Sequence, residues 1–134
     1  MRGVLVGVVA VQFVGCDKQP KIVPVSGRVL LDGEPLTMGS VQFIHPATRP
    51  AAGAIRDDGR FILSTYKQGD GAAPGHYRVR VIASEEAGSD AVRWNAPKKY
   101  ADEISSGIEF DIEGPVDDLV IELTWDGGKP FVER

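Results

Sequence analysis

Apolar and polar residues alternate most strictly between residues 76 and 82. Tyr77, Val79 and Val81 alternate there with a histidine and two arginines. β-branched and aromatic residues at every second position are typical of a strand with one buried face and one solvated face. Pro74-Gly75 is a turn signal directly before this run. The pattern therefore predicts a strand over residues 76–82, with the rest of the chain supplying its neighbours.

Other stretches show the same alternation, and Gly, Pro and Asp-Gly turn signals separate them. The predicted strands cover residues 25–31, 41–44, 54–56, 61–66, 76–82, 108–112 and 119–125. No amphipathic helix of three turns can be placed in the chain. Many short strands with frequent turns predict an all-β fold, a seven-stranded Greek-key β-sandwich of the transthyretin- or immunoglobulin-like kind. The predicted inner faces carry Val29, Leu31, Val41, Phe43, Ile55, Phe61, Leu63, Tyr77, Val79, Val81, Ile108, Phe110, Leu119, Ile121 and Leu123.

The segment from residue 84 to residue 106 lacks strand alternation. Pro97, with Asn95 shortly before it, favours one helical turn over residues 97–101. A long segment without regular structure inside a compact domain is either functional or wrongly assigned. We therefore expect a loop across one end or edge of the sandwich. The glycine-containing tail after residue 126 is expected to fray.

The first residues differ in composition from the rest of the chain. Arg2 is followed by an almost wholly apolar run at residues 4–14, and Gly15-Cys16 follows this run. This order is typical of a secretion signal, and it resembles a bacterial lipoprotein signal, in which Cys16 would be lipidated. A buried strand over residues 4–14 is the alternative. The predicted organisation is a signal peptide at 1–15, a lipidated cysteine and tether at 16–24, the β-sandwich at 25–126 and a tail at 127–134.

Length, charge and cysteine content narrow the possibilities further. The 134 residues suffice for one domain. A single cysteine cannot form an internal disulfide, and lipidation explains its presence in an exported chain. The net charge of −4 provides no basic surface for nucleic acid. These features predict an exported protein, anchored by lipid to the bacterial membrane or envelope, that does not bind nucleic acid.

The order of several short motifs resembles a known family. Val-Ser-Gly-Arg-Val at 25–29 is followed by Asp-Gly-Glu-Pro-Leu at 32–36, Asp-Asp-Gly-Arg-Phe at 57–61 and Pro-Gly-His-Tyr-Arg-Val at 74–79. Together they resemble carboxypeptidase regulatory-like domains, which are transthyretin-like sandwiches. Pro-Lys-Lys-Tyr at 97–100 and Ser-Ser-Gly at 105–107 extend the resemblance to small planctomycete lipoproteins. The resemblance implies a fold and a compartment but no reaction.

Candidate catalytic residues are scarce. His45 and His76 are the two histidines, and their sequence contexts favour unrelated turn or surface positions. The chain has no zinc-binding spacing and no Gly-x-Ser-x-Gly nucleophile motif. We therefore predict no catalytic residue, metal or cofactor. A hydrolase of the transthyretin-related kind is the weakest alternative, because it would need both histidines and an arginine in one pocket, and that family's C-terminal catalytic tetrapeptide is missing.

Five residues are candidates for binding. Trp94, Lys98, Lys99 and Tyr100 lie in the segment without alternation, and Arg78 lies on the polar face of the predicted strand 76–82. The two aromatic residues either form a platform for a sugar or a protein, or fold back as a lid over the core. Arg78 is expected to pair across strands with an acidic residue such as Glu109. The sequence thus predicts a non-enzymatic, membrane-anchored envelope lipoprotein whose β-sandwich acts as an interaction or structural module, with an envelope protein or a polysaccharide as the candidate partner. A carbohydrate-binding module using Trp94 and Tyr100 is the alternative.

Overall fold

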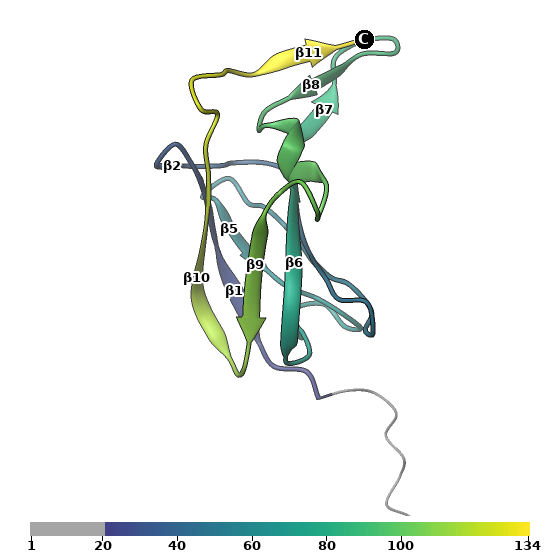
Figure 1. Ribbon diagram of the computed structural model, residues 1–134, viewed down its shortest axis with the longest axis vertical. Helices are drawn as coiled ribbons and strands as arrows, with labels where there is room; N and C mark the ends of the chain where they lie inside the picture. Colours follow the sequence, from purple (N-terminus) through teal and green to yellow (C-terminus); the bar gives the residue numbers. More distant parts are fainter. Residues whose placement is uncertain (1–20) are drawn as a thin grey trace, which may run out of the picture.

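The computed structural model describes residues 21–134, and these residues form an all-β protein (Figure 1). Eleven strands are arranged in three sheets, and one 3₁₀ turn, η1 (Lys98–Ala101), connects two of them. The strands are β1 (Val25–Leu31), β2 (Glu34–Pro35), β3 (Ser40–Ile44), β4 (Ala51–Ala54), β5 (Arg60–Ile62), β6 (Gly75–Ile82), β7 (Ser84–Glu86), β8 (Val92–Trp94), β9 (Ile108–Ile112), β10 (Val116–Leu123) and β11 (Phe131–Glu133). Within the described residues, no helix is long and apolar enough to cross a membrane.

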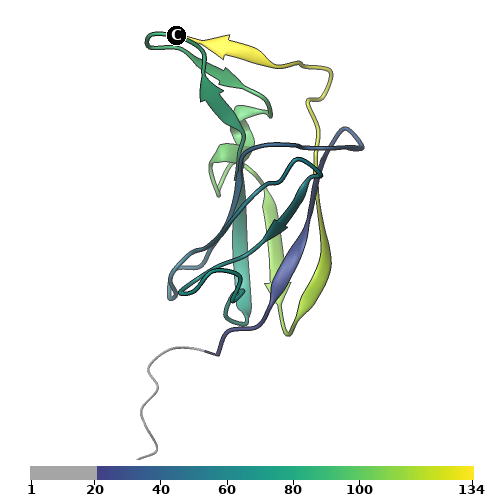
Figure 2. The same ribbon diagram turned by 180° about the vertical axis from the view of Figure 1, so that it is seen from behind.

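Two four-stranded sheets contribute to the core. One has the order β10-β1-β2, with β5 also paired to β1, and the other has the order β4-β3-β6-β9. β10 lies beside β1 in both views of the molecule, and the two strands pair in parallel (Figure 2). Buried residues of both sheets belong to one hydrophobic cluster, which includes Val29, Phe43, Phe61, Val79 and Ile121.

The third sheet is small and has the order β11-β8-β7. It lies at the end of the molecule opposite to the point where the chain enters the described part, and the C-terminus lies there too (Figure 1). β7 and β8 form a hairpin, and β11 adds to β8 with Phe131 opposite Trp94.

The strands predicted from strict alternation are confirmed, with small shifts at their ends. β1, β3, β6 and β9 lie at the predicted positions, and β10 begins three residues earlier than expected. The predicted inner faces are also confirmed, since most of their residues are buried and Leu31, Ile108 and Phe110 pack half-buried against the same cluster.

Four sequence predictions of local structure were wrong. The strand expected at residues 54–56 ends at Ala54 and begins at Ala51, and the strand expected at 61–66 is only Arg60–Ile62. The segment 84–106 contains the hairpin of β7 and β8, although the expected helical turn is confirmed as η1. The tail at 127–134 contains β11. Each of these strands has only three or four residues, too few for an alternation pattern of its own, so pairing with a neighbouring strand determines it.

The signal peptide predicted at 1–15 and the lipidated Cys16 lie outside the described residues. Part of the tether, residues 16–20, lies outside them as well. From residue 21 the chain joins the domain quickly, because Val23 already forms a bridge with Ala72.

Candidate functional site

A groove of about 510 Å³ lies on the outer face of the β4-β3-β6-β9 sheet. The end of β3 and the next two residues form one side with Ile44, His45 and Pro46. The segment between η1 and β9 forms the other side with Glu103 and Ile104. Strands β6 and β9 supply the floor, which consists of His76, Arg78 and Glu109. We refer to this site as the outer-face groove.

Strand register places the groove residues in rows across the sheet. Arg78 on β6 lies opposite Ile44 on β3 and opposite Glu109 on β9. His76 lies opposite Asp111 in the next outward-facing row. Successive side chains of a strand point to opposite faces, so the buried Tyr77 and Val79 force His76 and Arg78 outward. The alternation that buries the core therefore also builds the polar floor.

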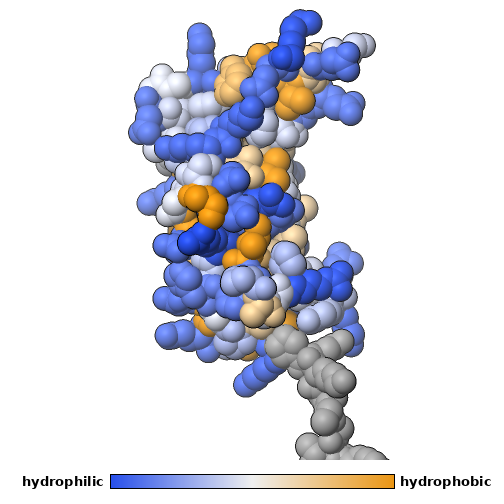
Figure 3. Space-filling model, turned by 45° about the vertical axis from the view of Figure 1, so that its right-hand side comes forward, coloured by the Kyte–Doolittle hydropathy of each residue, from blue (hydrophilic) through white to orange (hydrophobic). Residues whose placement is uncertain are grey.

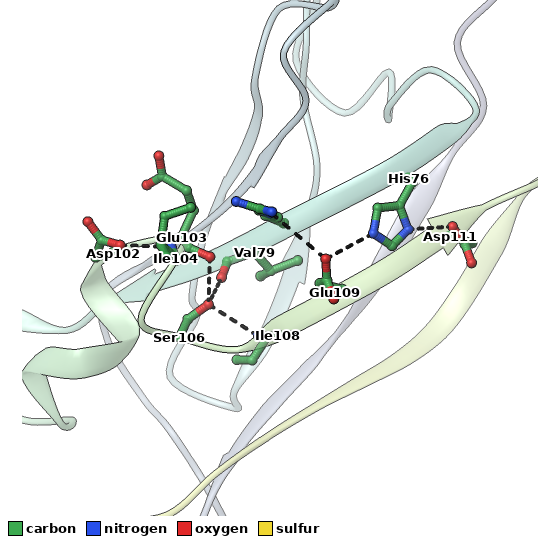
Figure 4. A network of polar contacts seen from close by, with 10 residues as sticks. His76, Val79, Asp102, Glu103, Ile104, Ser106, Ile108, Glu109 and Asp111 are labelled. Carbon is green, nitrogen blue, oxygen red and sulfur yellow. Dashed lines mark hydrogen bonds and ion pairs between the residues drawn. The ribbon is translucent and has the colours of Figure 1, made fainter.

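His76 lies between two carboxylates of β9 (Figure 4). Its Nδ1 is 2.6 Å from Asp111 Oδ1, and its Nε2 is 3.1 Å from Glu109 Oε1. A ring that donates from both nitrogens is an imidazolium. The hydrogen bonds to Glu109 and then Asp111 raise the pKa of His76 above its ordinary value, against a smaller desolvation effect. The two carboxylates thus favour the protonated form of His76 on the sheet surface.

Arg78 also contacts strand β9, at a longer distance than His76 does. Its Nε lies 3.8 Å from Glu109 Oε1, and about half of each side chain is exposed. The expected cross-strand pair of Arg78 and Glu109 is confirmed. The guanidinium donates no hydrogen bond to another residue in the described part of the chain, so most of its donors face the groove and solvent.

His45 is oriented by its neighbours rather than by a charge. Its Nδ1 accepts a hydrogen bond of 3.0 Å from the backbone N–H of Ala47, and its ring meets the Tyr77 ring edge-on at 5.7 Å. A neutral histidine that accepts at Nδ1 carries its proton on Nε2. His45 therefore presents an N–H donor, and this donor has no acceptor among residues 21–134.

The loop that carries Ile104 is fixed by several hydrogen bonds, three of which involve the side chains of Asp102 and Ser106. Asp102 Oδ1 accepts from the N–H groups of Ser105 and Ile104, and these bonds lower the pKa of Asp102. Ser106 Oγ donates to the carbonyl of Val79 on β6 (Figure 4). The Ile104 side chain nevertheless remains 64% exposed at the edge of the groove. An apolar side chain on a well-fixed loop is suited to contact a ligand or a partner.

The space-filling view shows how hydrophobic and hydrophilic residues are distributed over one face of the molecule. Hydrophobic residues lie among hydrophilic ones in the middle of the face, and others gather near the end farther from the grey segment (Figure 3). Exposed apolar residues of that distal end are Val92, Phe131 and Val132, on the small sheet.

The five binding residues predicted from the sequence lie in two places. Arg78 lies in the outer-face groove. The other four lie around η1 and the small sheet, where Lys98 Nζ lies 5.8 Å from the centroid of the half-buried Trp94 ring and forms an ion pair with Glu133. Lys99 Nζ lies 5.0 Å from the centroid of the Tyr100 ring.

Tyr100 packs in the interior. It is only 6% exposed and belongs to the hydrophobic cluster, and its hydroxyl accepts from the N–H of Thr124 at 3.1 Å. Trp94 is half-buried, and its Nε1 is buried without a hydrogen-bond partner in the described part of the chain. The two rings therefore do not form an open platform; Tyr100 covers the core, as the lid interpretation expects.

The sequence treated His45 and His76 as unrelated, and the structure places both at one groove together with Arg78. Glu103 and Ile104 also line it, although sequence reasoning gave them no role. The alternation on β6 was the available signal for His76 and Arg78. The position of His45 depends on how β3 pairs with β6, which no local pattern reveals.

Within residues 21–134, no group of three or more His, Cys, Asp or Glu side chains is placed to hold a metal ion. No family model, no curated protein and no solved structure matches this chain.

Proposed function

We propose that this chain is a membrane-anchored, non-enzymatic envelope lipoprotein whose β-domain binds a partner through the outer-face groove. The observation that carries the proposal is the groove itself. It combines apolar walls, contributed by Ile44, Pro46 and Ile104, with a few convergent polar groups on its floor. Binding sites on proteins commonly have this composition.

The proposed fold is a Greek-key β-sandwich of the transthyretin-like, carboxypeptidase regulatory-like kind. Two sheets that contribute to a single hydrophobic cluster support this assignment. The motif order at residues 25–29, 32–36, 57–61 and 74–79 supports it as well. The small β11-β8-β7 sheet is then an addition to that fold, at the end far from the chain entry.

The proposed anchor is a lipid on Cys16. The basic start, the apolar run at residues 4–14 and Gly15 before the only cysteine support this assignment. Stable membrane attachment needs more than one acyl chain, and each buried CH₂ contributes about 0.8 kcal/mol. An anchor at Cys16 would leave the small sheet as the membrane-distal end of the domain.

The chemistry of the groove favours binding over hydrolysis. Both ring nitrogens of His76 are engaged by carboxylates, so His76 is a poor general base. In the described part of the chain, no serine or threonine hydroxyl is hydrogen-bonded to either histidine. The burial of Tyr100 likewise gives the carbohydrate-binding alternative less support than the groove gives to the present proposal.

The anchor is tested with Cys16→Ser. We expect the parent protein in the membrane fraction, and the variant either released from it or unprocessed. A variant that fractionates and migrates like the parent would contradict the lipoprotein assignment, because the thiol is the only acceptor for such a lipid in the chain.

The groove is tested by photocrosslinking in the native envelope. Ile104 is replaced by the photoreactive residue p-benzoylphenylalanine, and the matched control carries the same residue in place of Ile62. Both positions are exposed isoleucines, but Ile62 lies on β5 of the other sheet. We expect a discrete crosslinked product from position 104 and none from position 62. Absence of a product at position 104, or equal products at both, would overturn the proposed binding role of the groove.

A further inference from the structure

The two large sheets are linked on one side of the domain and unpaired on the other. Ala52 on β4 and Ser64, shortly after β5, exchange two backbone hydrogen bonds on the linked side. On the other side lie β9 and β10, which residues 113–115 connect (Figure 1). Among the described strands, β9 pairs only with β6, and β10 pairs only with β1. We propose that an extended segment of a partner protein, with alternating basic and apolar residues, adds to the free edge of β10 as a further strand. This surface is separate from the outer-face groove, so the inference goes beyond the proposed function.

The free edge of β10 offers backbone groups for pairing. The carbonyl of Leu123 accepts a hydrogen bond from the N–H of Asp32, so Leu123 directs its backbone groups toward β1. Backbone groups of successive strand residues point to opposite edges, so Val120 and Glu122 direct theirs away from β1. No described segment hydrogen-bonds to them on that side. With eight residues, β10 is the longest edge strand of the described sheets, and extended peptides bind to such edges through main-chain hydrogen bonds.

Apolar side chains beside this edge are incompletely covered. Ile108 and Phe110 on β9 and Val116 on β10 pack against the hydrophobic cluster but remain partly exposed. The buried side chains of Leu119 and Ile121 show which face of β10 is turned toward the core. Alternate side chains of an added strand would point to the same side as these two residues and would extend the apolar cover of the core. The partner segment therefore needs an apolar residue at every second position.

The charges along β9 and β10 determine the remaining positions of the partner. Between residues 104 and 128 the chain has no lysine, arginine or histidine, and acidic residues stand at positions 109, 111, 113, 117, 118, 122 and 126. Some of them pair with cations of other segments, namely Glu109, Asp111, Asp118 and Asp126. The exposed carboxylates of Glu113 and Glu122 form no ion pair with a described residue. Opposite charges on neighbouring strands attract and like charges repel, so this edge favours a basic segment and disfavours the same edge of a second copy.

The experiment follows amide hydrogen exchange of the ¹⁵N-labelled full chain by NMR, with and without the peptide Ac-Lys-Val-Lys-Val-Lys-Val-Lys-NH₂. We expect millimolar peptide to slow exchange of the Val120 and Glu122 amides by at least about tenfold, because an added strand supplies acceptors for both. The Ile121 amide faces β1 and should be protected without peptide, so it is the internal control. Unchanged exchange at Val120 and Glu122 would overturn the proposal.

Two further peptides separate strand addition from attraction by charge alone. Ac-Glu-Val-Glu-Val-Glu-Val-Glu-NH₂ should bind at least about tenfold more weakly than the lysine peptide, because its charges repel those of β10. Ac-Lys-Lys-Lys-Lys-Val-Val-Val-NH₂ has the composition and charge of the first peptide without its alternation. It should bind more weakly and leave the Val120 amide unprotected. Equal binding of the first peptide and either of these two would overturn the proposal.

Variants assign the binding to β10, and their NMR spectra verify that each is folded. Glu122→Lys should weaken binding of the alternating lysine peptide and tighten binding of the glutamate peptide. Glu86→Lys is the matched control, because Glu86 is also an exposed strand glutamate without an ion pair in the described residues. Val120→Pro removes the N–H at an edge position where a strand tolerates proline, and it should abolish binding, whereas Val120→Thr should retain it. Equal effects of the two lysine substitutions would contradict the assignment to β10.

The same spectra show whether another segment occupies the edge. Protection of the Val120 and Glu122 amides in the absence of peptide would overturn the proposal. Protection that rises with protein concentration would identify a second copy as the occupant, and protection independent of concentration would identify the N-terminal segment of the chain itself. If no peptide binds while position 104 still crosslinks in the envelope, this inference fails and the proposed function stands.

Discussion

One side chain, Asp70, orders the turn that joins β5 to β6. Its two carboxylate oxygens accept hydrogen bonds from the backbone N–H groups of Thr65, Tyr66 and Lys67. Desolvation works to raise the pKa of Asp70, but the backbone hydrogen bonds from these three residues together outweigh it and hold the pKa below its ordinary value. The carboxylate is therefore more stable in the folded protein than in the unfolded chain.

We expect Asp70→Asn to lower the free energy of unfolding by about 1 kcal/mol at pH 7, a cost similar to that of losing a helix cap. Because the folded-state pKa is depressed, this contribution is present above the unfolded pKa of about 3.9 and is lost as the pH falls through the folded value. Urea titrations at pH 7 and pH 3 should show a gap between parent and variant that shrinks at the lower pH. A gap that is the same at both pH values would mean that the charge of Asp70 plays no part.

At the scale of elements, β6 connects the core to the groove. It is an inner strand of its sheet, between β3 and β9. Its inward residues Tyr77, Val79 and Val81 are almost completely buried, and its outward residues include the groove residues His76 and Arg78. The two faces of β6 should therefore respond differently to substitution.

We expect Val79→Ala to lower the free energy of unfolding by about 1–4 kcal/mol, because it removes methyl groups from a closely packed site that is 0% exposed. Phe110→Ala, which removes a ring stacked on Phe43 at 6.1 Å, should cost an amount in the same range. Arg78→Ala and Glu109→Ala should cost less than about 1 kcal/mol, as half-exposed ion pairs do. Chemical denaturation measures all four, and equal losses from both sets would show that the assignment of faces is wrong.

The sequence predicts the strands whose own apolar and polar side chains alternate. It does not predict the strands that form only because another part of the chain pairs with them. β4 consists of three alanines and a glycine, which have low strand propensity, yet it pairs with β3 residue by residue. β8 and β11 are three residues each and meet across a long stretch of chain, with Trp94 opposite Phe131. Neither strand carries a periodic signal long enough to detect on its own.

Only those residues of the outer-face groove that lie on alternating strands could be predicted from the sequence. Arg78 and its pairing with Glu109 follow from alternation on two adjacent strands. His45 follows a strand and precedes a proline, so its place next to the floor depends on the β3–β6 register. Ile104 is exposed in a segment without periodicity, and only the hydrogen bonds of Asp102 and Ser106 show that the segment is fixed.

At the scale of the whole molecule, a parallel seam between β1 and β10 closes the first sheet. Gly27 lies at an irregularity in this seam, where the backbones approach closely: a Cβ at Gly27 would lie 2.0 Å from the carbonyl oxygen of Leu119. Glycine is required there because any side chain would push the two strands apart.

We expect Gly27→Ala to lower the free energy of unfolding by about 3 kcal/mol or more, at the upper end of the costs of overpacking. Gly114→Ala is the matched control, because a Cβ at Gly114 would meet nothing within 4 Å. Thermal denaturation of both variants measures the difference. Similar melting temperatures for the two would show that the seam is less tightly packed than its geometry indicates.

The seam also decides when the domain can fold during synthesis. A chain made from its N-terminus carries β1 early, whereas its parallel partner β10 emerges only after all the strands from β2 to β9. Contacts between distant parts of a chain form slowly, because closing the long loop between them costs entropy before the contacts compensate. The first sheet thus stays incomplete until β10 has been synthesised, so the domain cannot reach its native fold before Leu123 has emerged.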